Sequence, residues 1–276
     1  MKKIFALLLA FAMIFALAAC GGSAPAADPA PAADAPAAPA AESDLAYVQS
    51  NGKLVVGITD FAPMDYRDDS GEWIGFDADL AKAFAKSIGV EVEFIEIDWD
   101  NKILELNAKA IDCVWNGMTL TDEVLKSMSC SVPYARNAQV VVMKADAADQ
   151  YSDAESMAGL SFAVEAGSAG EEAAVDAGFD TVAVSTQADA LMGVAAGTSD
   201  ACVIDLLMAV AMTGEGTSYA DLTYTLSLNE EQYGIGFRQG SNLVDTFNEF
   251  YAAAYADGTV DALADTYELT GSTIAP

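Results

Sequence analysis

The residues that could do chemistry in this chain include 42 aspartates and glutamates and four cysteines, but no histidine. Without an imidazole the chain cannot build a Ser-His-Asp or Cys-His nucleophile system, and it has no group that titrates near neutrality without help. This excludes most common hydrolase mechanisms and all imidazole metal sites.

Two polar residues stand at the ends of predicted elements, where parallel α/β sheets place ligand-binding groups. Asp205 directly follows an apolar segment, 201–204, whose pattern is typical of a buried strand. It could instead cap the helix that we expect to follow, at 206–212. Ser168 comes after Gly167 at the start of an alanine-rich helix, where its N–H and hydroxyl could hold an anion or simply cap the helix.

The elements that must position these residues alternate between strand and helix from about residue 44 onward. The first half has strands at 53–58, 90–97 and 111–115 and helices at 76–88 and 103–110. The second half repeats this order, with strands at 139–143, 160–164, 181–184 and 201–204, helices from about 167 and at 187–196, and a mostly helical tail at 242–267. This order predicts an α/β fold with mainly parallel sheets in two compact halves.

The first 19 residues are typical of a bacterial export signal. Two lysines precede an uncharged apolar run, 4–19, which is too short for a comfortable membrane span. The run ends in Leu17-Ala18-Ala19-Cys20, which resembles a lipobox, and this implies cleavage before Cys20 and attachment of diacylglycerol to its sulfur. The alternative is an ordinary secretory signal followed by an incidental cysteine. Residues 20–43 hold five of the eight prolines among alanines, which predicts a disordered tether.

The charge of the chain narrows the class of partner. Against 42 acidic side chains there are 12 lysines and arginines, which gives a formal net charge of −30. Such a chain is repelled by phosphate backbones, so nucleic acid is excluded as a partner. The same field draws in cationic solutes and slows anionic ones.

Six segments in a fixed order resemble the family 3 extracellular solute-binding proteins, the polar amino-acid receptors of ABC importers. They lie at 75–80 (GFDADL), 116–123 (NGMTLTDE), 133–134 (PY), 166–168 (AGS), 200–205 (DACVID) and 232–237 (QYGIGF), and the resemblance covers about 54–267. It implies a two-lobed, type II periplasmic-binding-protein-like clamshell with two crossing hinge strands. By the same resemblance, lobe 1 comprises 44–137 and 232–276, and lobe 2 comprises 138–231.

The resemblance also implies a function and partners. It describes an extracytoplasmic receptor, anchored to the cell membrane by lipid, that binds an amino acid or a close derivative in the interlobe cleft. The receptor would deliver this ligand to an ABC permease and its ATPase. We expect a monomer that has no cofactor, no metal and no enzymatic activity.

The resemblance assigns ligand-binding roles to seven residues. Asp205 matches the aspartate that binds the ligand's ammonium, and Phe61 and Trp99 match the aromatic residues that sandwich the ligand. Trp99 is flanked by two aspartates, which is unusual for a core residue, whereas Phe61 before an Ala-Pro pair is typical of one. Asn-Gly is also a common turn sequence. The remaining matches offer backbone and hydroxyl groups and are Asn116, Gly117, Thr119 and Ser168.

One position departs from the family pattern. Most members carry an arginine after the Thr-x-Asp/Glu-Glu segment, where it grips the ligand's α-carboxylate, but this chain has Val124. Either backbone N–H groups near Thr119 and Ser168 hold the carboxylate, or the ligand is an amine or another polar solute without one. Arg136 is the arginine that we expect nearest the cleft.

Two rival classes remain open. Some proteins that resemble this family are arogenate or prephenate dehydratases, which use a cleft carboxylate as an acid. An extracytoplasmic sensor domain is the other class.

Once Cys20 is assigned to lipid, the cysteines Cys113, Cys130 and Cys202 have no metal-ligand spacing and cannot all pair, so we expect small core residues with free thiols.

Overall fold

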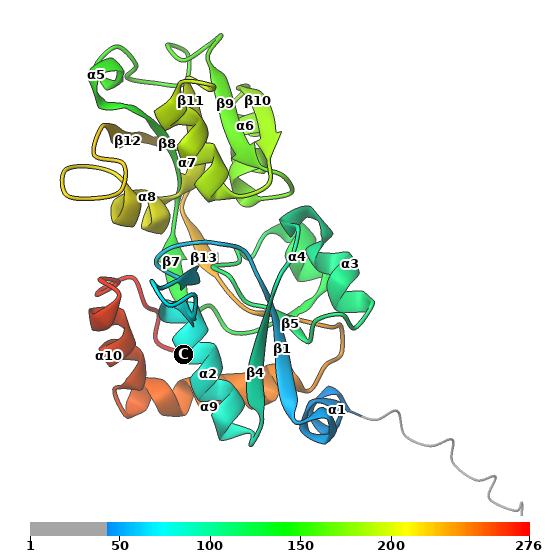
Figure 1. Ribbon diagram of the computed structural model, residues 1–276. Helices are drawn as coiled ribbons and strands as arrows, with labels where there is room; N and C mark the ends of the chain where they lie inside the picture. Colours follow the sequence, from blue (N-terminus) through cyan, green and yellow to red (C-terminus); the bar gives the residue numbers. More distant parts are fainter. Residues whose placement is uncertain (1–42) are drawn as a thin grey trace, which may run out of the picture. The chain divides into compact units, whose positions relative to one another are not determined.

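The computed structural model describes residues 43–276 (Figure 1). The predicted signal peptide 1–19, the predicted lipid-bearing Cys20 and the tether up to residue 42 lie outside the described residues. None of the described helices combines the length and the apolar character that a membrane span needs. The described chain folds into two α/β lobes, each built on a five-stranded sheet, and this confirms the two-lobed α/β prediction.

The first lobe is built on a sheet with the strand order β4-β1-β5-β14-β6. β1 pairs in parallel with β4 and β5, and β14 pairs antiparallel with β5 and β6. Successive side chains of β1 point to opposite faces, so Leu54 and Val56 belong to one core and Val55 packs against another. The strands are β1 (Lys53–Ile58), β4 (Glu91–Glu96), β5 (Cys113–Val114), β6 (Ser129–Cys130) and β14 (Gly236–Phe237).

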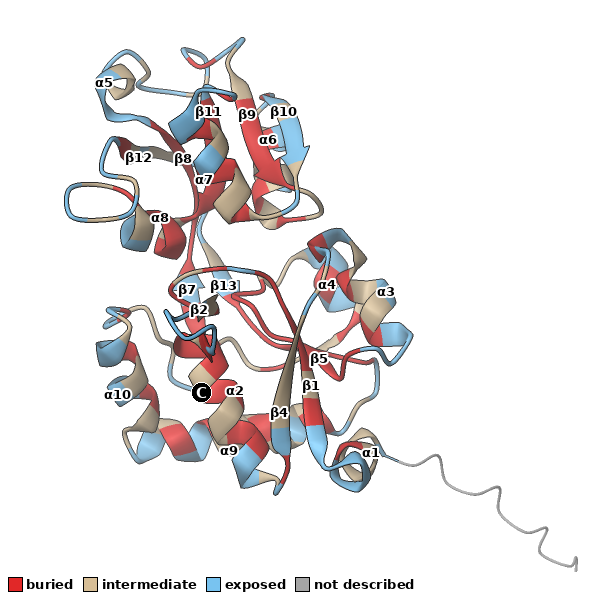
Figure 2. Ribbon diagram, in the orientation of Figure 1, coloured by how far each residue is buried: buried red, intermediate tan, exposed pale blue. Residues whose placement is uncertain are grey.

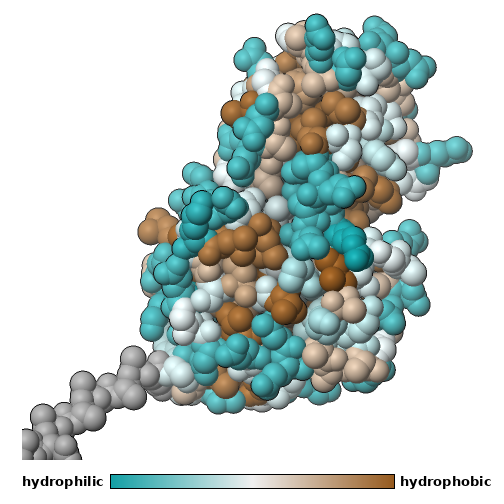
Figure 3. Space-filling view, turned by 180° about the vertical axis from the view of Figure 1, so that it is seen from behind, coloured by the Kyte–Doolittle hydropathy of each residue, from teal (hydrophilic) through white to brown (hydrophobic). Residues whose placement is uncertain are grey.

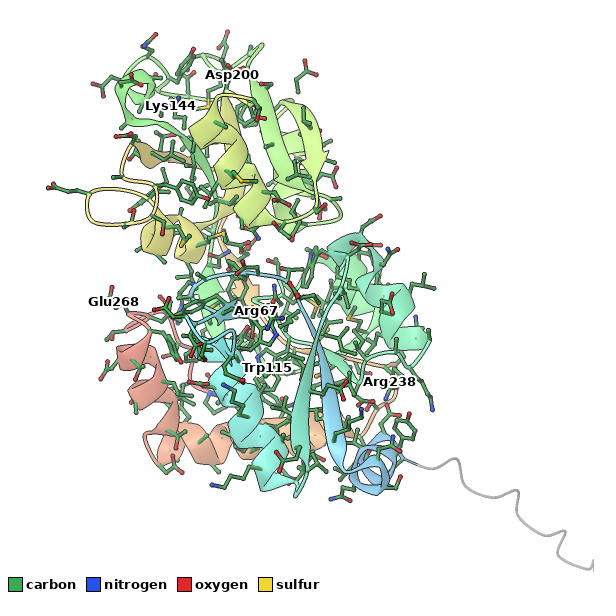
Figure 4. The ribbon with its side chains drawn as sticks, viewed as in Figure 1. Arg67, Trp115, Lys144, Asp200, Arg238 and Glu268 are labelled. Atoms are coloured by element: carbon green, nitrogen blue, oxygen red, sulfur yellow. The ribbon has the colours of Figure 1, made fainter. Side chains whose placement is uncertain are left out.

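Helices bury both faces of this first sheet. On one face α2 and α9 contribute to an aromatic cluster around Trp115, whose ring centroid lies 5.1 Å from that of Phe247 (Figure 4). On the other face α3 and α4 contribute Leu106 and Val124 to a smaller core. The elements are α1 (Asp44–Asn51), β2 (Tyr66–Arg67), β3 (Trp73–Ile74), α2 (Phe76–Ser87), the 3-10 turn η1 (Trp99–Asn101), α3 (Lys102–Asn107), α4 (Asp122–Ser127), α9 (Leu243–Ala256) and α10 (Thr259–Thr266).

The second lobe has the strand order β10-β9-β11-β8-β12. β9 is buried along most of its length (Figure 2), because Phe162 and Val164 share a core with Ala174 of α6 while Ala163 shares one with Leu191 of α7. The two helices therefore cover opposite faces. The elements are β8 (Gln139–Lys144), α5 (Ala145–Ala148), β9 (Ser161–Glu165), α6 (Ala169–Asp176), β10 (Asp180–Val184), α7 (Gln187–Ala196), β11 (Ala201–Asp205), α8 (Leu206–Met212) and β12 (Leu222–Ser227).

Two antiparallel strands, β7 (Ala135–Asn137) and β13 (Glu231–Tyr233), connect the lobes. The predicted lobe boundaries after residue 137 and before residue 232 fall at the end of β7 and within β13. On the face seen in Figure 3, hydrophilic residues gather where the two lobes meet.

Two details differ from the sequence prediction. The sheets are mixed rather than mainly parallel, because β8, β12 and β14 run antiparallel to their neighbours where the chain enters or leaves a connecting strand. The predicted tail helix is interrupted, because Gly258 has a φ of 85°, a left-handed conformation that a continuous helix cannot contain. α9 therefore ends at Ala256 and α10 begins at Thr259.

The three described cysteines are free thiols, as the odd number predicts. Cys113 and Cys202 are buried in strands of different lobes, and burial raises the pKa of each thiol well above its ordinary range. Cys130 is partly buried. Raised pKa values keep these thiols protonated, which is typical of unreactive core cysteines.

Candidate ligand-binding site

A cavity of about 330 Å³ is lined by residues of both lobes. The first lobe contributes Trp99, Lys102 and the loop after β5, and the second contributes the ends of β9 and β11 and the start of α6. Carboxyl ends of strands are where α/β sheets expose ligand-binding groups. The volume suits a small molecule.

Six of the seven residues that the sequence predicts for ligand binding line this cavity, and the exception is Phe61. Phe61 is 2% exposed and lies behind Gly117, where a Cβ would come within 2.3 Å of the Phe61 ring. Its ring packs edge-on against Tyr233, with centroids 6.4 Å apart. Of the predicted aromatic pair, the structure therefore brings Trp99 to the cavity wall and leaves Phe61 in the core. The six are Trp99, Asn116, Gly117, Thr119, Ser168 and Asp205.

The GFDADL segment positions the loop that contains Gly117. Gly75 has a φ of 125°, and a Cβ there would lie 2.1 Å from the carbonyl oxygen of Met64, so the position requires glycine. Two residues later the buried Asp77 accepts hydrogen bonds on Oδ2 from Gly117 N and from the Tyr134 hydroxyl, each at 2.7 Å. The N–H of Gly117 is therefore bound within the protein.

Asn116 and Thr119 also direct their polar groups to other parts of the protein. Asn116 Oδ1 accepts a hydrogen bond from Thr59 N and its Nδ2 donates to Thr59 Oγ1, both at 2.8 Å. The Thr119 hydroxyl donates to Glu231 Oε1 at 2.7 Å. These residues shape the cavity, and their side chains tie the loop after β5 to the end of β1 and to β13.

Ser168 caps α6 rather than leaving its N-terminus open for an anion. Its Oγ accepts a hydrogen bond from Glu171 N at 3.0 Å, and Glu171 Oε2 accepts one from Gly167 N at 2.7 Å. This arrangement resembles a capping box, except that the Glu171 carboxylate accepts from the residue before the cap and not from Ser168 itself. Glu171 thus supplies the negative charge that the helix dipole favours, in the place where the sequence predicts a ligand carboxylate.

Asp205 ends β11 and is 4% exposed, and its side chain makes no capping hydrogen bond to α8. Oδ1 accepts hydrogen bonds from the Tyr233 hydroxyl at 2.7 Å, from Gln139 Nε2 at 3.0 Å and from Asn137. Oδ2 accepts one from Gln187. The predicted ammonium-binding carboxylate is therefore joined to both connecting strands.

Glu165, the last residue of β9, is a second buried carboxyl group in the cavity wall. It is 3% exposed, and its Oε1 has no hydrogen-bond partner among the described residues. Burial raises its pKa to about 8, with the charge of Asp205 adding to the effect and that of Lys102 opposing it. Burial and the charge of Glu231 likewise raise the pKa of Asp205 to about 8. Both charged forms are thus destabilised in the absence of a ligand.

Lys102 brings a cation to the same cavity. It is 6% exposed, and its Nζ lies 5.0 Å from the centroid of the Trp99 ring. The ammonium donates hydrogen bonds to Gly167 O at 2.8 Å and to Trp99 O at 3.3 Å, so it links the first lobe to the second. Burial lowers its pKa, and the nearby acids Glu123 and Glu165 oppose that effect.

Val124 lines the cavity where the family pattern has an arginine, and it is 3% exposed in the core that includes Trp99. Two of the domain's arginines have structural roles away from the cavity (Figure 4). Arg67 lies over the Trp73 ring, with 4.1 Å to the centroid. Arg238 forms salt bridges with Asp44 and Asp112, each at 3.1 Å.

Arg136 lies on β7 and lines a neighbouring cavity of about 1000 Å³ instead of the first one. The two cavities share Thr119 and Thr121 in their walls. Arg136 Nη1 donates to the carbonyl oxygen of Thr273 at 3.3 Å, so its guanidinium is directed to the C-terminal segment.

Sequence reasoning did not identify Lys102, Glu165 or Gln187 as cavity residues. Each had a weak signal. Lys102 follows Trp99 by three residues, a spacing that places both on one side of a helical turn. Glu165 comes directly after the predicted strand 160–164, and Gln187 begins a predicted helix, so both stand at the strand and helix ends that face ligands.

The family of bacterial extracellular solute-binding proteins, family 3, matches residues 54–270. The L-cystine-binding protein TcyJ of Escherichia coli is 26% identical over 230 residues, which cover 82% of this chain and 86% of TcyJ. A crystal structure of a mutant of ArgBP from T. maritima is similar, with a TM-score of 0.76 and 31% identity over 82% of this chain and 99% of that one. The ancestral amino acid-binding protein AncCDT-1, a precursor of cyclohexadienyl dehydratase, has a TM-score of 0.75 and 32% identity over 82% of this chain and 99% of its own. The cavity between two α/β lobes and the match over most of its length agree: the chain belongs to the family 3 bacterial extracellular solute-binding proteins.

Proposed function

We propose that this protein is the substrate-binding component of an ABC importer and that it binds an amino acid or a close derivative between its lobes. A lipid on Cys20 anchors it outside the cytoplasm, and it delivers the ligand to a permease and its ATPase. Family membership supports the solute-binding role. The names of TcyJ and AncCDT-1, a cystine-binding and an amino acid-binding protein, support an amino acid as the ligand.

The observation that carries this proposal is the cavity whose wall includes Trp99 of one lobe and Asp205 of the other. An aromatic face and a buried carboxylate together suit an ammonium group with an apolar stem. Lys102 offers the cation that a ligand carboxylate needs, because its ammonium has three hydrogens and two of them are bound to carbonyl oxygens. Lys102 thus takes over the task that Val124 cannot perform.

A second candidate ligand is an amine without a carboxylate, and the acidic lining of the cavity favours it. Val124 offers no hydrogen-bond donor, and Glu171 already occupies the start of α6. The cavity wall contains six carboxyl groups and, among the described residues, one basic group, Lys102. Such a wall attracts cations and repels anions.

Titration calorimetry and thermal shift with the twenty amino acids, polyamines and quaternary amines test the proposal. We expect at least one amino acid to raise the melting temperature and to bind with one site per chain. Stabilisation by amines alone would replace the amino acid with the second candidate. If no compound of either class binds the folded protein, the receptor proposal is wrong.

The anchor is tested separately by changing Cys20→Ser in the full chain expressed in a bacterium. We expect the wild-type protein to remain with the membrane fraction and the variant to be processed differently and released. Globomycin, which blocks lipoprotein signal cleavage, should leave the wild type as the longer precursor. Tight membrane association of mature Cys20→Ser protein would contradict lipidation.

A further inference from the structure

Glu165 is a buried acid whose carboxyl group lies near the polar side chains of Gln187 and Thr59, and one of its oxygens is left without a hydrogen bond. Its side chain stands at the carboxyl end of β9 in the cavity wall, and Oε1 is enclosed without a hydrogen bond from any described residue. Buried polar atoms in native proteins are nearly always paired, and one without a partner needs an explanation. A group supplied by a ligand in the cavity explains it.

The neighbours of Glu165 do not neutralise it. Asp205 lines the same cavity, and its charge disfavours the ionised form of Glu165. Among the described residues its Oδ2 accepts one hydrogen bond, from Gln187, which leaves it capacity for a second. Lys102 lies near enough to influence Glu165, but the hydrogen bonds of its ammonium go to the carbonyl oxygens of Trp99 and Gly167. Glu165 and Asp205 are therefore two of the six carboxyl groups in a cavity wall with one basic group among the described residues, and two of the three hydrogens of that ammonium are bound to carbonyl oxygens.

We propose that Glu165 and Asp205 form a two-carboxylate subsite that binds a cationic group of the ligand, so that this receptor takes solutes with a net positive charge. This inference rests on the proposed function and specifies its ligand. The shared chemistry is an alkylammonium or guanidinium group beyond the α-ammonium that every amino acid carries, and a basic amino acid and a diamine both have such a second cation. Each places N–H donors between the two carboxyl groups and supplies the partner that Oε1 lacks.

A consequence is that ligand binding releases protons. Burial raises the pKa of Glu165 and of Asp205 to about 8, so the empty cavity holds protons on these groups at pH 7. A bound cation favours the ionised forms and lowers both pKa values. The protons leave to the buffer, and their number is measured by calorimetry in buffers that differ in ionisation enthalpy.

Three probes with one carbon skeleton separate the possible sources of the cation. L-Lysine carries the side-chain ammonium and the α-carboxylate, L-norleucine lacks the side-chain ammonium, and cadaverine lacks the carboxylate. We expect lysine to bind at least tenfold more tightly than norleucine and to release protons at pH 7. Cadaverine binding as tightly as lysine identifies an amine receptor, and weaker cadaverine binding identifies a basic amino acid; either result keeps the subsite.

The variant Glu165→Gln keeps the shape of the side chain and removes its charge. We expect a loss of tenfold or more in affinity for the cationic probe that binds the wild type, and fewer protons released. Glu155→Gln is the matched control, because Glu155 is an exposed glutamate of the same lobe that lines neither cavity. It removes the same charge and should change affinity by less than twofold.

Two results overturn the inference while leaving the receptor function intact. They are norleucine binding as tightly as lysine, and equal affinity of Glu165→Gln and wild type. The first needs no variant, so it stands even if Glu165→Gln folds poorly. If neither the cationic probes nor any amino acid or amine binds, both this inference and the proposed function fail.

Discussion

Two pairs of buried carboxyl groups lie in this protein, one in the core of the first lobe and one in the wall of the ligand cavity. Asp65 and Asp77 are both 0% exposed, and neither lines the two cavities described above. Glu165 and Asp205 are 3% and 4% exposed and line the smaller cavity. Both pairs are buried, but only Glu165 and Asp205 can be reached by a ligand in a cavity.

Burial raises the pKa of all four carboxyl groups. The pKa of Asp77 is raised to about 6, those of Glu165 and Asp205 to about 8, and that of Asp65 well above its ordinary range, with the charge of Asp77 adding to the effect of burial. A raised pKa alone therefore does not identify a ligand site. Access from a cavity makes an acid available to a ligand, whereas a sealed acid can only affect stability.

The largest effect on stability is expected from Asp77→Ala. It leaves the N–H of Gly117 and the hydroxyl of Tyr134 without an acceptor in the core. Each unpaired buried donor costs about 1–3 kcal/mol, so the free energy of unfolding at pH 7 should fall by roughly 3 kcal/mol. Urea unfolding followed by circular dichroism measures this, with the exposed Asp69→Ala as a control that should change stability by less than about 0.5 kcal/mol. An Asp77→Ala loss under about 1 kcal/mol contradicts the structural role.

The next largest effect is expected on binding, from Lys102→Met. Lys102 lines the same cavity as Glu165 and Asp205. Two hydrogens of its ammonium are bound to carbonyl oxygens, and we expect the third to hold a ligand carboxylate. A hydrogen bond to a charged group contributes about 1.5–3 kcal/mol. The variant should therefore lose at least tenfold in affinity for an amino acid, and less for the diamine of the same length.

The matched control for this change is Lys144→Met, at an exposed position of the second lobe that lines neither cavity (Figure 4). It should bind both ligands as the wild type does. Equal losses for amino acid and diamine in Lys102→Met would show that the lysine supports the closed cavity through Gly167 rather than by contacting a carboxylate.

The free protein should lose stability as the pH rises from 5 to 8. A carboxyl group whose folded-state pKa lies above the unfolded value keeps a proton that the unfolded chain releases, so stability falls as pH rises from the unfolded value to the folded one. This loss is complete near pH 6 for Asp77 and near pH 8 for Glu165 and Asp205. The melting temperature, measured by calorimetry, should fall across the whole range.

Glu165→Gln separates the two pairs in this experiment. The groups that face Glu165 are Asp205 and Lys102, and Glu231 adds charge near Asp205. Removing Glu165 should make the fall shallower over the whole range from pH 5 to pH 8. The part that Asp77 contributes, which ends near pH 6, should remain. A variant that follows the wild-type curve throughout would show that Glu165 is ionised in the free protein.

The smallest effect is expected from Asp65→Asn. Burial and the charge of Asp77 raise the pKa of Asp65 well above its ordinary range, which favours the neutral form, and among the described residues neither of its oxygens has a hydrogen-bond partner. A neutral amide of the same shape should therefore replace it with little loss. We expect the free energy of unfolding to change by less than about 1 kcal/mol and ligand affinity to stay the same. A loss above about 2 kcal/mol in urea unfolding would mean that Asp65 is ionised and paired in the core.

The fold could be predicted from the sequence because its elements carry strong local signals. The strand predicted at 53–58 is β1, and the helices predicted at 76–88 and 187–196 are α2 and α7. Strand direction was harder to predict, because the antiparallel pairing of β8 and β14 depends on how the chain crosses between lobes, which no local pattern records.

The location of the site residues in the cavity wall was also predictable from the sequence, but the hydrogen-bond partners of their polar groups were not. Asn116 and Gly117 line the cavity as expected, yet their hydrogen-bonding groups are taken by Thr59 and Asp77, which are distant in sequence. Glu165 was missed because an acidic residue after an apolar strand resembles a solvent-exposed loop residue. Its place in the wall of a cavity lined by both lobes is not recorded in the local sequence.

The hydrogen bonds of Asp205 bear on how receptors of this kind change their ligand. Because this carboxylate accepts hydrogen bonds from Asn137 and Tyr233 on the two connecting strands, a substitution there alters the joint between the lobes as well as the cavity. Lys102, Glu165 and Val124 border the same cavity without hydrogen bonds to those strands. Substitutions at these three positions can therefore change ligand specificity without altering the connection between the lobes, whereas a substitution of Asp205 alters both. A receptor can thus evolve to bind a new ligand while the connecting strands on which uptake depends stay the same.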